Sequence, residues 1–158
     1  MHQWVDIFTR PIYREIIFES LRYCQEAKGL KIFAWVIMSN HIHLINSSQA
    51  ENLSDIIKDF KKYTSKKNAK AIEDNPHESR KEWLLLALKV EDRIWFWEEG
   101  YHGVEISSIE LYESKVNYIH LNPVRNGLVE NAEDYLLSSV KDFLDKGKSI
   151  LNLSFING

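Results

Sequence analysis

Residues 30–45 constrain the fold of this chain more than any other stretch, because they have the pattern of a β-hairpin. Residues 30–37 (LKIFAWVI) are rich in β-branched and aromatic side chains, which favour strands. Residues 38–40 (MSN) have the length of a tight turn, and residues 41–45 (HIHLI) form the predicted returning strand. The sequence therefore predicts two antiparallel strands against which the rest of the chain packs.

The returning strand contains two histidines, His41 and His43. Alternate residues of a strand point to the same face, so their imidazoles share one face, about 7 Å apart by strand rise, with Ile42 on the other. Two imidazoles at this spacing can bind one metal ion through one ring nitrogen each. The alternative is that both rings merely line a half-buried sheet face. We favour metal binding, because burying an unpaired imidazole costs free energy.

Length and composition predict one globular domain. The chain has 158 residues, of which 44% are hydrophobic and 27% charged. Its single cysteine excludes an internal disulfide and a cysteine-based zinc cage, so we expect a reducing, cytoplasmic environment. No stretch has the length of a membrane span, so no membrane partner is expected. With a formal net charge of −3, a nucleic-acid interface would need a local basic patch.

The rest of the chain predicts helices and short strands. Residues 2–8 have the pattern of the end of a strand, and a helix follows from Pro11 to Gly29, with a predicted buried stripe of Ile12, Ile16, Ile17, Leu21 and Cys24. A second helix is predicted over 53–73. A third over 78–89 is expected to bury Trp83, Leu84, Leu85, Leu86 and Leu88, and an aromatic strand follows over 93–97.

The helix over 53–73 is the most basic part of the chain, with Lys58, Lys61, Lys62, Lys66, Lys67 and Lys70. These lysines can form a solvated helix face, balanced by Asp55 and Asp59. They can also form a surface that follows a phosphate backbone, helped by the hydroxyl groups of Tyr63, Thr64 and Ser65. On this helix alone, the solvated face is the better interpretation.

A last helix is predicted over 108–122, with a serine at 107 or 108 as its cap and Pro123 as its end. Tyr118 and Asn122 share one face of it, because four residues make about one turn, whereas His120 points elsewhere. Taken alone, such a tyrosine is most often a core residue with a hydrated hydroxyl group, and an asparagine before proline most often caps a helix.

Two blocks of this sequence, taken together, are similar to a known family. Residues 34–45 (AWVIMSNHIHLI) and residues 118–129 (YIHLNPVRNGLV) resemble the REP-associated tyrosine transposases. These belong to the HUH superfamily of single-tyrosine DNA transposases, in which U is a bulky apolar residue, here Ile42. The resemblance extends from about residue 4 to about residue 143. A bare HUH triplet is a weak signal, but both blocks in this order and at this separation are a strong one.

The resemblance implies an α+β fold, in which helices pack on an antiparallel sheet related to the ferredoxin-like fold. We expect a single HUH transposase-like domain over residues 1–158, with a core of about 4–143 and a tail over 144–158. Family members have a full strand ahead of the first helix. Met1 falls inside or just after that position, so three alternatives stay open: a misplaced start, a gene remnant with a truncated first strand, or a strand for which residues 2–8 suffice.

The resemblance also implies an activity. His41 and His43 would be metal ligands, Asn122 would reach the metal from the tyrosine's helix, and Tyr118 would be the nucleophile. Mixed nitrogen and oxygen ligands suit Mg²⁺ or Mn²⁺. The implied enzyme nicks and rejoins single-stranded DNA at hairpin-forming repeats through a 5′-phosphotyrosine. We expect it in the cytoplasm, associated with the nucleoid when bound to DNA. Superfamily relatives are often dimers, which makes a homodimer an expectation by analogy.

Two other functions stay open. A domesticated or truncated relative would bind hairpin DNA without cleaving it, and cleavage of a labelled single strand with Mn²⁺ distinguishes the two. A hydrolytic metalloenzyme would use the same histidine pair on a small molecule, and trapping of a DNA–protein adduct would exclude it.

Overall fold

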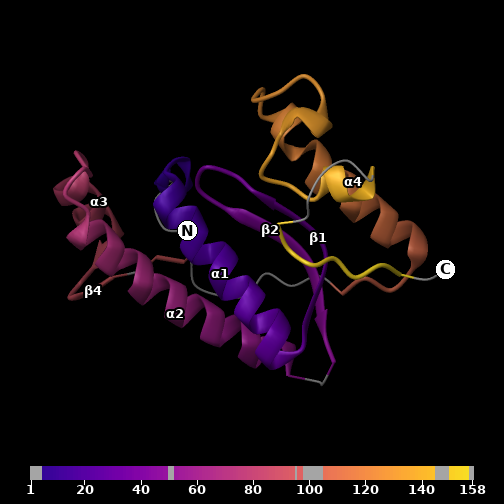
Figure 1. The fold of residues 1–158 in the computed structure, drawn as a ribbon, viewed down its shortest axis with the longest axis horizontal. Helices are drawn as coiled ribbons and strands as arrows, with labels where there is room; N and C mark the ends of the chain where they lie inside the picture. The colour runs from indigo at the N-terminus through magenta and orange to yellow at the C-terminus, as the bar shows by residue number, and fades with distance from the viewer. Residues whose placement is uncertain (1–4, 50–51, 95, 98–104, 145–149, 157–158) are drawn as a thin grey trace.

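The computed structural model describes residues 5–49, 52–94, 96–97, 105–144 and 150–156. In chain order the elements are η2 (Ile7–Thr9), α1 (Pro11–Lys28), β1 (Leu30–Ile37), β2 (Ile42–Ser48), α2 (Leu53–Asp74), α3 (Lys81–Leu88), β3 (Lys89–Val90), β4 (Arg93–Ile94), α4 (Ile109–Arg125), η3 (Ala132–Asp134) and α5 (Val140–Phe143). The β1–β2 hairpin lies between α1 and α2 on one side and α4 on the other (Figure 1). None of the helices in this described part is long and apolar enough to cross a lipid bilayer.

Strand β1 is apolar on both faces, because each face covers a different cluster. Trp35 and Ile37 pack in the cluster with α1, α2 and α3, whereas Ala34 and Val36 pack in the cluster with α4. The register shifts between Ile32 and Ala34. A bulge of this kind adds one residue, so Ile32 and Trp35 face the same cluster although they are three positions apart. The hairpin predicted from sequence is confirmed, with β1 ending at Ile37.

The edge of β1 that does not pair with β2 is covered by the C-terminal part of the chain. The Ile37 N–H donates to the Leu137 carbonyl at 2.9 Å, and the Ser139 N–H donates to the Trp35 carbonyl at 3.0 Å. Further along, the Ser154 N–H donates to the Ile32 carbonyl at 2.8 Å. The backbone groups at Ile32, Trp35 and Ile37 are therefore paired on this edge and do not offer a template for another strand.

The start of the described chain differs from the strand predicted over 2–8. Ile7–Thr9 form a 3₁₀-helix, and the Thr9 hydroxyl group donates to the Asp6 carbonyl at 3.0 Å. Pro11 then begins α1, since its fixed φ suits the first helical position and it needs no N–H partner there. Residues 2–4 lie outside the described part. The apolar side chains that suggested a strand are buried by packing instead.

Two helices bury different stripes from those predicted. In α1 the side chain of Ile12 is 47% exposed, and the buried position beside it is Tyr13. In α3 only Leu84 and Leu88 are buried, while Trp83 and Leu86 are exposed by 56% and 72%. A short helix packed on one side buries only the residues one turn apart on that side, which accounts for the exposed positions between them.

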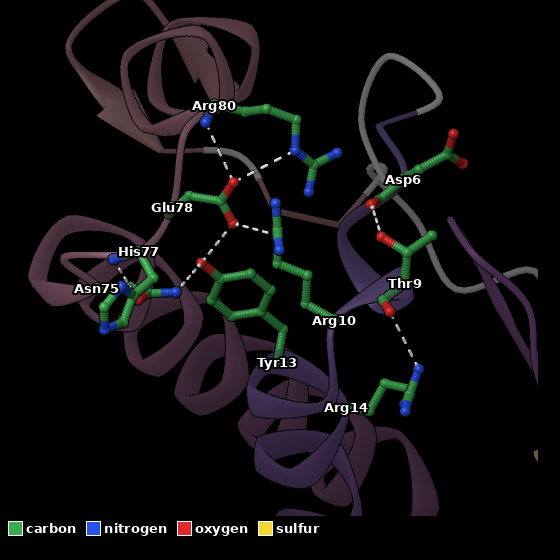
Figure 2. A network of polar contacts seen from close by, with 9 residues as sticks. All are labelled: Asp6, Thr9, Arg10, Tyr13, Arg14, Asn75, His77, Glu78 and Arg80. Atoms are coloured by element: carbon green, nitrogen blue, oxygen red, sulfur yellow. Dashed lines mark hydrogen bonds and ion pairs between the residues drawn. The ribbon is translucent and has the colours of Figure 1, made fainter.

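Tyr13 is buried because its hydroxyl group has a charged partner. It donates to Glu78 Oε2 at 2.9 Å, and Arg10 and Arg80 approach the same carboxylate at 3.0 and 3.3 Å (Figure 2). Burial opposes ionisation of Glu78, but the hydrogen bonds from Tyr13 and Arg80 and the charge of Arg80 outweigh it and hold its pKa below the ordinary value. The network ties the start of α1 to the segment between α2 and α3.

Candidate active site

His41 and His43 come together where β2 begins. His43 pairs with Val36 in the sheet, and the His41 carbonyl accepts from the Met38 N–H at 2.8 Å, which closes the turn. The two ring centroids are 4.9 Å apart and the rings meet edge to face. Both imidazoles therefore lie on one side of the hairpin, as strand alternation predicts, while Ile42 packs in the opposite cluster. Their role as metal ligands stays a prediction.

Both imidazoles are held in the neutral form, which is the form that binds metal ions. Burial, followed by the charges of His41 and Arg125, lowers the pKa of His43 to about 4. Burial also lowers the pKa of His41. His41 Nδ1 lies 2.7 Å from the Asn40 Oδ1. Because an amide oxygen only accepts, Nδ1 holds the hydrogen and Nε2 of the neutral ring keeps its lone pair.

Helix α4 brings Tyr118 to the histidines. The helix begins at Ser108, whose side-chain oxygen accepts from the Leu111 N–H at 3.1 Å. Its inner face packs Val116 and Ile119 against β1 and β2. Tyr118 itself is 51% exposed, and its ring centroid lies 6.0 Å from that of His43. The phenol group is therefore open to a substrate on the side of the molecule that holds both imidazoles.

Asn122 lies one turn beyond Tyr118 on α4 and is only 4% exposed. Its Oδ1 accepts from Asn126 Nδ2 at 2.7 Å, and its backbone carbonyl accepts from the same Nδ2 at 2.9 Å. The Asn122 carboxamide is thus fixed by Asn126. An amide oxygen has two lone pairs, so Oδ1 keeps one acceptor position beyond this bond.

The prediction that Pro123 ends this helix is wrong, because α4 continues to Arg125. The Leu128 N–H donates to the Pro123 carbonyl at 2.9 Å, and the Gly127 N–H donates to the Val124 carbonyl at 3.0 Å. Gly127 has a φ of 73°. These two bonds around a left-handed glycine form a Schellman motif, which ends the helix one turn after the proline. Pro123 removes one hydrogen bond, but the motif satisfies the last carbonyl groups.

Two cations that the sequence analysis did not single out lie against Tyr118. The Arg125 Cζ is 4.1 Å from the centroid of the Tyr118 ring, and the Lys115 Nζ is 5.9 Å from it. Lys115 is a neighbour that helical spacing identifies. Arg125 lies two turns away, so its contact depends on how its long side chain folds back along α4. His120, by contrast, points away as predicted, and its Nε2 lies 2.8 Å from Ser139 Oγ.

The basic helix α2 does not join this group. It packs in the cluster on the other face of the hairpin, opposite α4 (Figure 1). Lys61 is half-buried there and Lys70 pairs with Asp74 at 2.9 Å, while Lys58, Lys62, Lys66 and Lys67 are exposed. An open hollow of about 850 Å³ between α2 and α3 is lined by Lys62, Lys66 and Lys70.

The hydroxyl group of Thr64 cannot contact a phosphate backbone, although the sequence offered that interpretation. It is buried in α2, where it donates to the Phe60 carbonyl at 2.7 Å and accepts from Trp97 Nε1 at 2.9 Å. Trp97 in turn packs against the ring of Phe60, and Phe96 is buried beside it. Thr64 therefore belongs to the core, whereas Tyr63, which was predicted to share the phosphate-binding surface with it, is exposed.

Imidazole nitrogens and a carboxamide oxygen are donor types that a divalent ion accepts. Within the described residues, no group of three or more His, Cys, Asp or Glu side chains lies together. A carboxamide oxygen is another type of donor that Mg²⁺ and Mn²⁺ accept. Asn122 is such a donor through the second lone pair of its Oδ1.

These features define a class of protein: an α+β domain with paired histidines on a hairpin and an exposed tyrosine on a helix facing them. A family model described as "Transposase IS200 like" matches residues 5–122. The chain belongs to this family of IS200-like transposases. No curated protein matches the chain significantly.

A solved structure shares the fold. It is described as a REP-associated tyrosine transposase bound to a REP hairpin, and it superposes with a TM-score of 0.63 over 99% of this chain and 82% of its own. At 17% identity this likeness shows the fold, which confirms the predicted α+β architecture. The family resemblance read from the two sequence blocks is confirmed as well.

Proposed function

We propose that this chain is a metal-dependent transposase that nicks and rejoins single-stranded DNA at hairpin-forming repeats, with Tyr118 as the nucleophile. One observation carries the proposal, namely that the exposed Tyr118 ring lies beside the histidine pair. The ring centroids of Tyr118 and His43 are 6.0 Å apart, and those of His43 and His41 are 4.9 Å apart. Membership of the IS200-like transposase family supports it. So does a fold shared with a protein that is described as bound to a hairpin.

In the proposed cleavage step, the Tyr118 Oη attacks the phosphorus of a DNA phosphodiester. An Oη–P bond forms and the bond from phosphorus to the 3′ oxygen breaks. The phenol proton leaves to solvent, and the leaving 3′ oxygen takes up a proton to become a 3′ hydroxyl group. The 5′ phosphate stays on Tyr118, so a later attack by a 3′ hydroxyl group restores a continuous strand. Exposure of the ring suits this role, because a long substrate must reach it.

His41, His43 and Asn122 would hold Mg²⁺ or Mn²⁺. When bound, such an ion supplies positive charge for the phosphate oxygens and for the leaving 3′ oxygen. The neutral imidazoles support this assignment, since protonated rings would repel the ion.

The proposed partner is single-stranded or hairpin DNA. The lysines of α2 would contact its backbone away from Tyr118, because α2 and α4 lie on opposite faces of the hairpin. A substrate that reaches both would have to pass around the sheet. Assembly into a homodimer stays a prediction by analogy.

The test uses hairpin oligonucleotides taken from imperfect palindromes that flank the gene. Each is labelled on the 3′ side of the candidate nick, incubated with Mn²⁺ and protein, and separated by denaturing electrophoresis. Wild-type protein should give a labelled product that migrates with protein. Tyr118→Phe should abolish this product and retain DNA binding, whereas His41→Ala should abolish it by weakening metal binding.

Two results would change the proposal. Tight hairpin binding with no adduct from wild-type protein would favour the relative that binds DNA without cleaving it. An adduct that persists in Tyr118→Phe would assign the nucleophile to another tyrosine, of which Tyr112 is the nearest in sequence.

A further inference from the structure

Arg125 contacts Tyr118 twice. Its Nη2 donates to the Tyr118 backbone carbonyl at 2.6 Å, and its guanidinium carbon lies 4.1 Å from the centroid of the Tyr118 ring. A guanidinium over a tyrosine face is attracted by the negative charge density of the ring. One side chain therefore holds both the backbone and the ring of the same tyrosine.

The end of α4 makes this contact possible. Pro123 has no N–H to donate within the helix, and its ring crowds the carbonyl group four residues before it. The carbonyl group that loses its helical partner in this way is that of Ile119, next to Tyr118, and the Tyr118 carbonyl in the same turn accepts from the Arg125 side chain. Because Gly127 ends the helix shortly afterwards, Arg125 lies in the last turn, where a cation also interacts favourably with the helix dipole.

We propose that Arg125 is a positioning residue for Tyr118, which holds the phenol ring beside His43 in one orientation. The inference rests on the proposed function, in which Tyr118 is the nucleophile. An exposed tyrosine on a helix surface has more than one accessible rotamer, and each rotamer moves its Oη by several ångströms. The Arg125 guanidinium on one face and the His43 ring at 6.0 Å limit that choice. Attack on phosphorus requires an aligned oxygen, so a fixed ring raises the rate on bound DNA.

A purely structural role is the alternative. Arg125 could stabilise the end of α4 through its charge and its carbonyl bond alone, with no effect on the ring. The two roles differ in what happens to the Tyr118 side chain and to the cleavage rate at saturating DNA. A readout of both is therefore needed.

The experiment compares Arg125→Gln, which removes the charge, with Arg125→Lys, which keeps it but loses the planar group. Lys115→Gln is the matched control, because it removes a cation near the same ring, at 5.9 Å, from the same helix. Ring motion is measured by NMR relaxation of ¹³C-labelled tyrosine in DNA-free protein, with the Tyr118 signal assigned from Tyr118→Phe. The rate constant of adduct formation is measured in single turnovers at saturating hairpin DNA with Mn²⁺.

Arg125→Gln should make the Tyr118 ring more mobile and lower the saturated rate by roughly tenfold, with a smaller change in DNA affinity. Arg125→Lys should fall between wild type and Arg125→Gln, and Lys115→Gln should change both readouts by less than about twofold. Amide NMR spectra that overlay outside α4 verify that each variant is folded.

Unchanged ring motion in Arg125→Gln would overturn the inference, and so would a loss that lies wholly in DNA affinity. These results differ from a failure of the proposed function. An adduct that survives Tyr118→Phe would overturn the proposed function and the catalytic purpose of the contact with it. If the adduct requires Tyr118 but Arg125→Gln leaves the motion of the Tyr118 ring unchanged, only the proposed role of Arg125 is overturned.

Discussion

Histidines that lie on neighbouring elements of this fold have different surroundings. His41 and His43 lie together where β2 begins. His120, two residues after Tyr118, is buried between α4 and the C-terminal segment. Its Nε2 lies 2.8 Å from Ser139 Oγ, and Ser139 Oγ also accepts from the Trp35 N–H at 2.9 Å. His120 therefore links the tyrosine's helix to β1 and to the segment that covers its edge.

This placement makes stability depend on pH. Burial lowers the pKa of His120 from 6.5 to about 4. The unfolded chain thus binds a proton on this ring between pH 6.5 and about 4 that the folded protein does not bind. The contribution of the neutral His120 ring to the free energy of unfolding is fully present above pH 6.5. It is lost as the pH falls toward 4, by about 3 kcal/mol in total.

Urea unfolding of metal-free protein at several pH values between 7 and 4 measures this loss. Replacing His120 by Gln should flatten the pH dependence by that amount. His77→Gln is the control for the loss of a histidine side chain, because His77 is exposed on the segment between α2 and α3. An identical pH profile for His120→Gln and wild type would show that folding does not lower the pKa of His120.

Strand alternation was sufficient to place the two metal-binding candidates on one face, since it depends only on neighbouring residues. The contact between Arg125 and Tyr118 could not be predicted in the same way. It depends on the path of a long side chain over two helical turns and on a proline that the helix tolerates. Likewise, Tyr13 was buried in place of Ile12 because a distant carboxylate, Glu78, satisfies its hydroxyl group.

At the scale of elements, the end of α4 depends on Gly127, whose φ of 73° is unfavourable for a residue with a Cβ. A Cβ added there would meet nothing within 4 Å, so strain in the backbone is the whole cost. Gly127→Ala should therefore destabilise the protein by about 1 kcal/mol. Gly127→Asn should cost less, because asparagine tolerates this conformation.

Urea unfolding of both variants measures the difference. Equal stability of Gly127→Ala and wild type would mean that the Schellman motif does not require this conformation. Loss of stability by both variants to the same extent would mean that the cost comes from contacts rather than from φ.

Helix α2 provides a second test at this scale. Replacing the exposed Lys62, Lys66 and Lys67 by alanine should weaken hairpin binding and reduce the slope of log affinity against log salt by about 2 to 3, because fewer counterions are released. The saturated cleavage rate should stay near that of wild type, because α2 lies on the face of the hairpin away from Tyr118.

Fluorescence anisotropy at several salt concentrations measures the slope, and Lys31→Ala, an exposed lysine on β1, serves as control. A slope unchanged by the triple substitution would assign these lysines to a solvated helix face. That was the simpler interpretation of α2 from sequence alone.

For the molecule as a whole, the hairpin and the three longest helices follow from local patterns, and the structure confirms them. No local pattern predicts the partner of the edge of β1 away from β2. Leu137 and Ser139 reach it from far along the chain, through a pairing that only the assembled core defines. For the same reason, hydrophobicity alone placed Leu86 in the core, although α3 turns it to solvent.

The proposed role of Tyr118 as nucleophile concerns the whole molecule, because it requires α4, the hairpin and bound DNA to come together. The most direct measurement locates the covalent bond. Adduct formed with hairpin DNA and Mn²⁺ is treated with nuclease and trypsin, and the peptides are analysed by mass spectrometry. Cleavage after Lys115 and Arg125 isolates residues 116–125, in which Tyr118 is the single tyrosine, whereas Tyr112 falls in the preceding peptide. The account predicts a nucleotide phosphate on Tyr118 in this peptide, and a phosphate on the peptide of Tyr112 would contradict it.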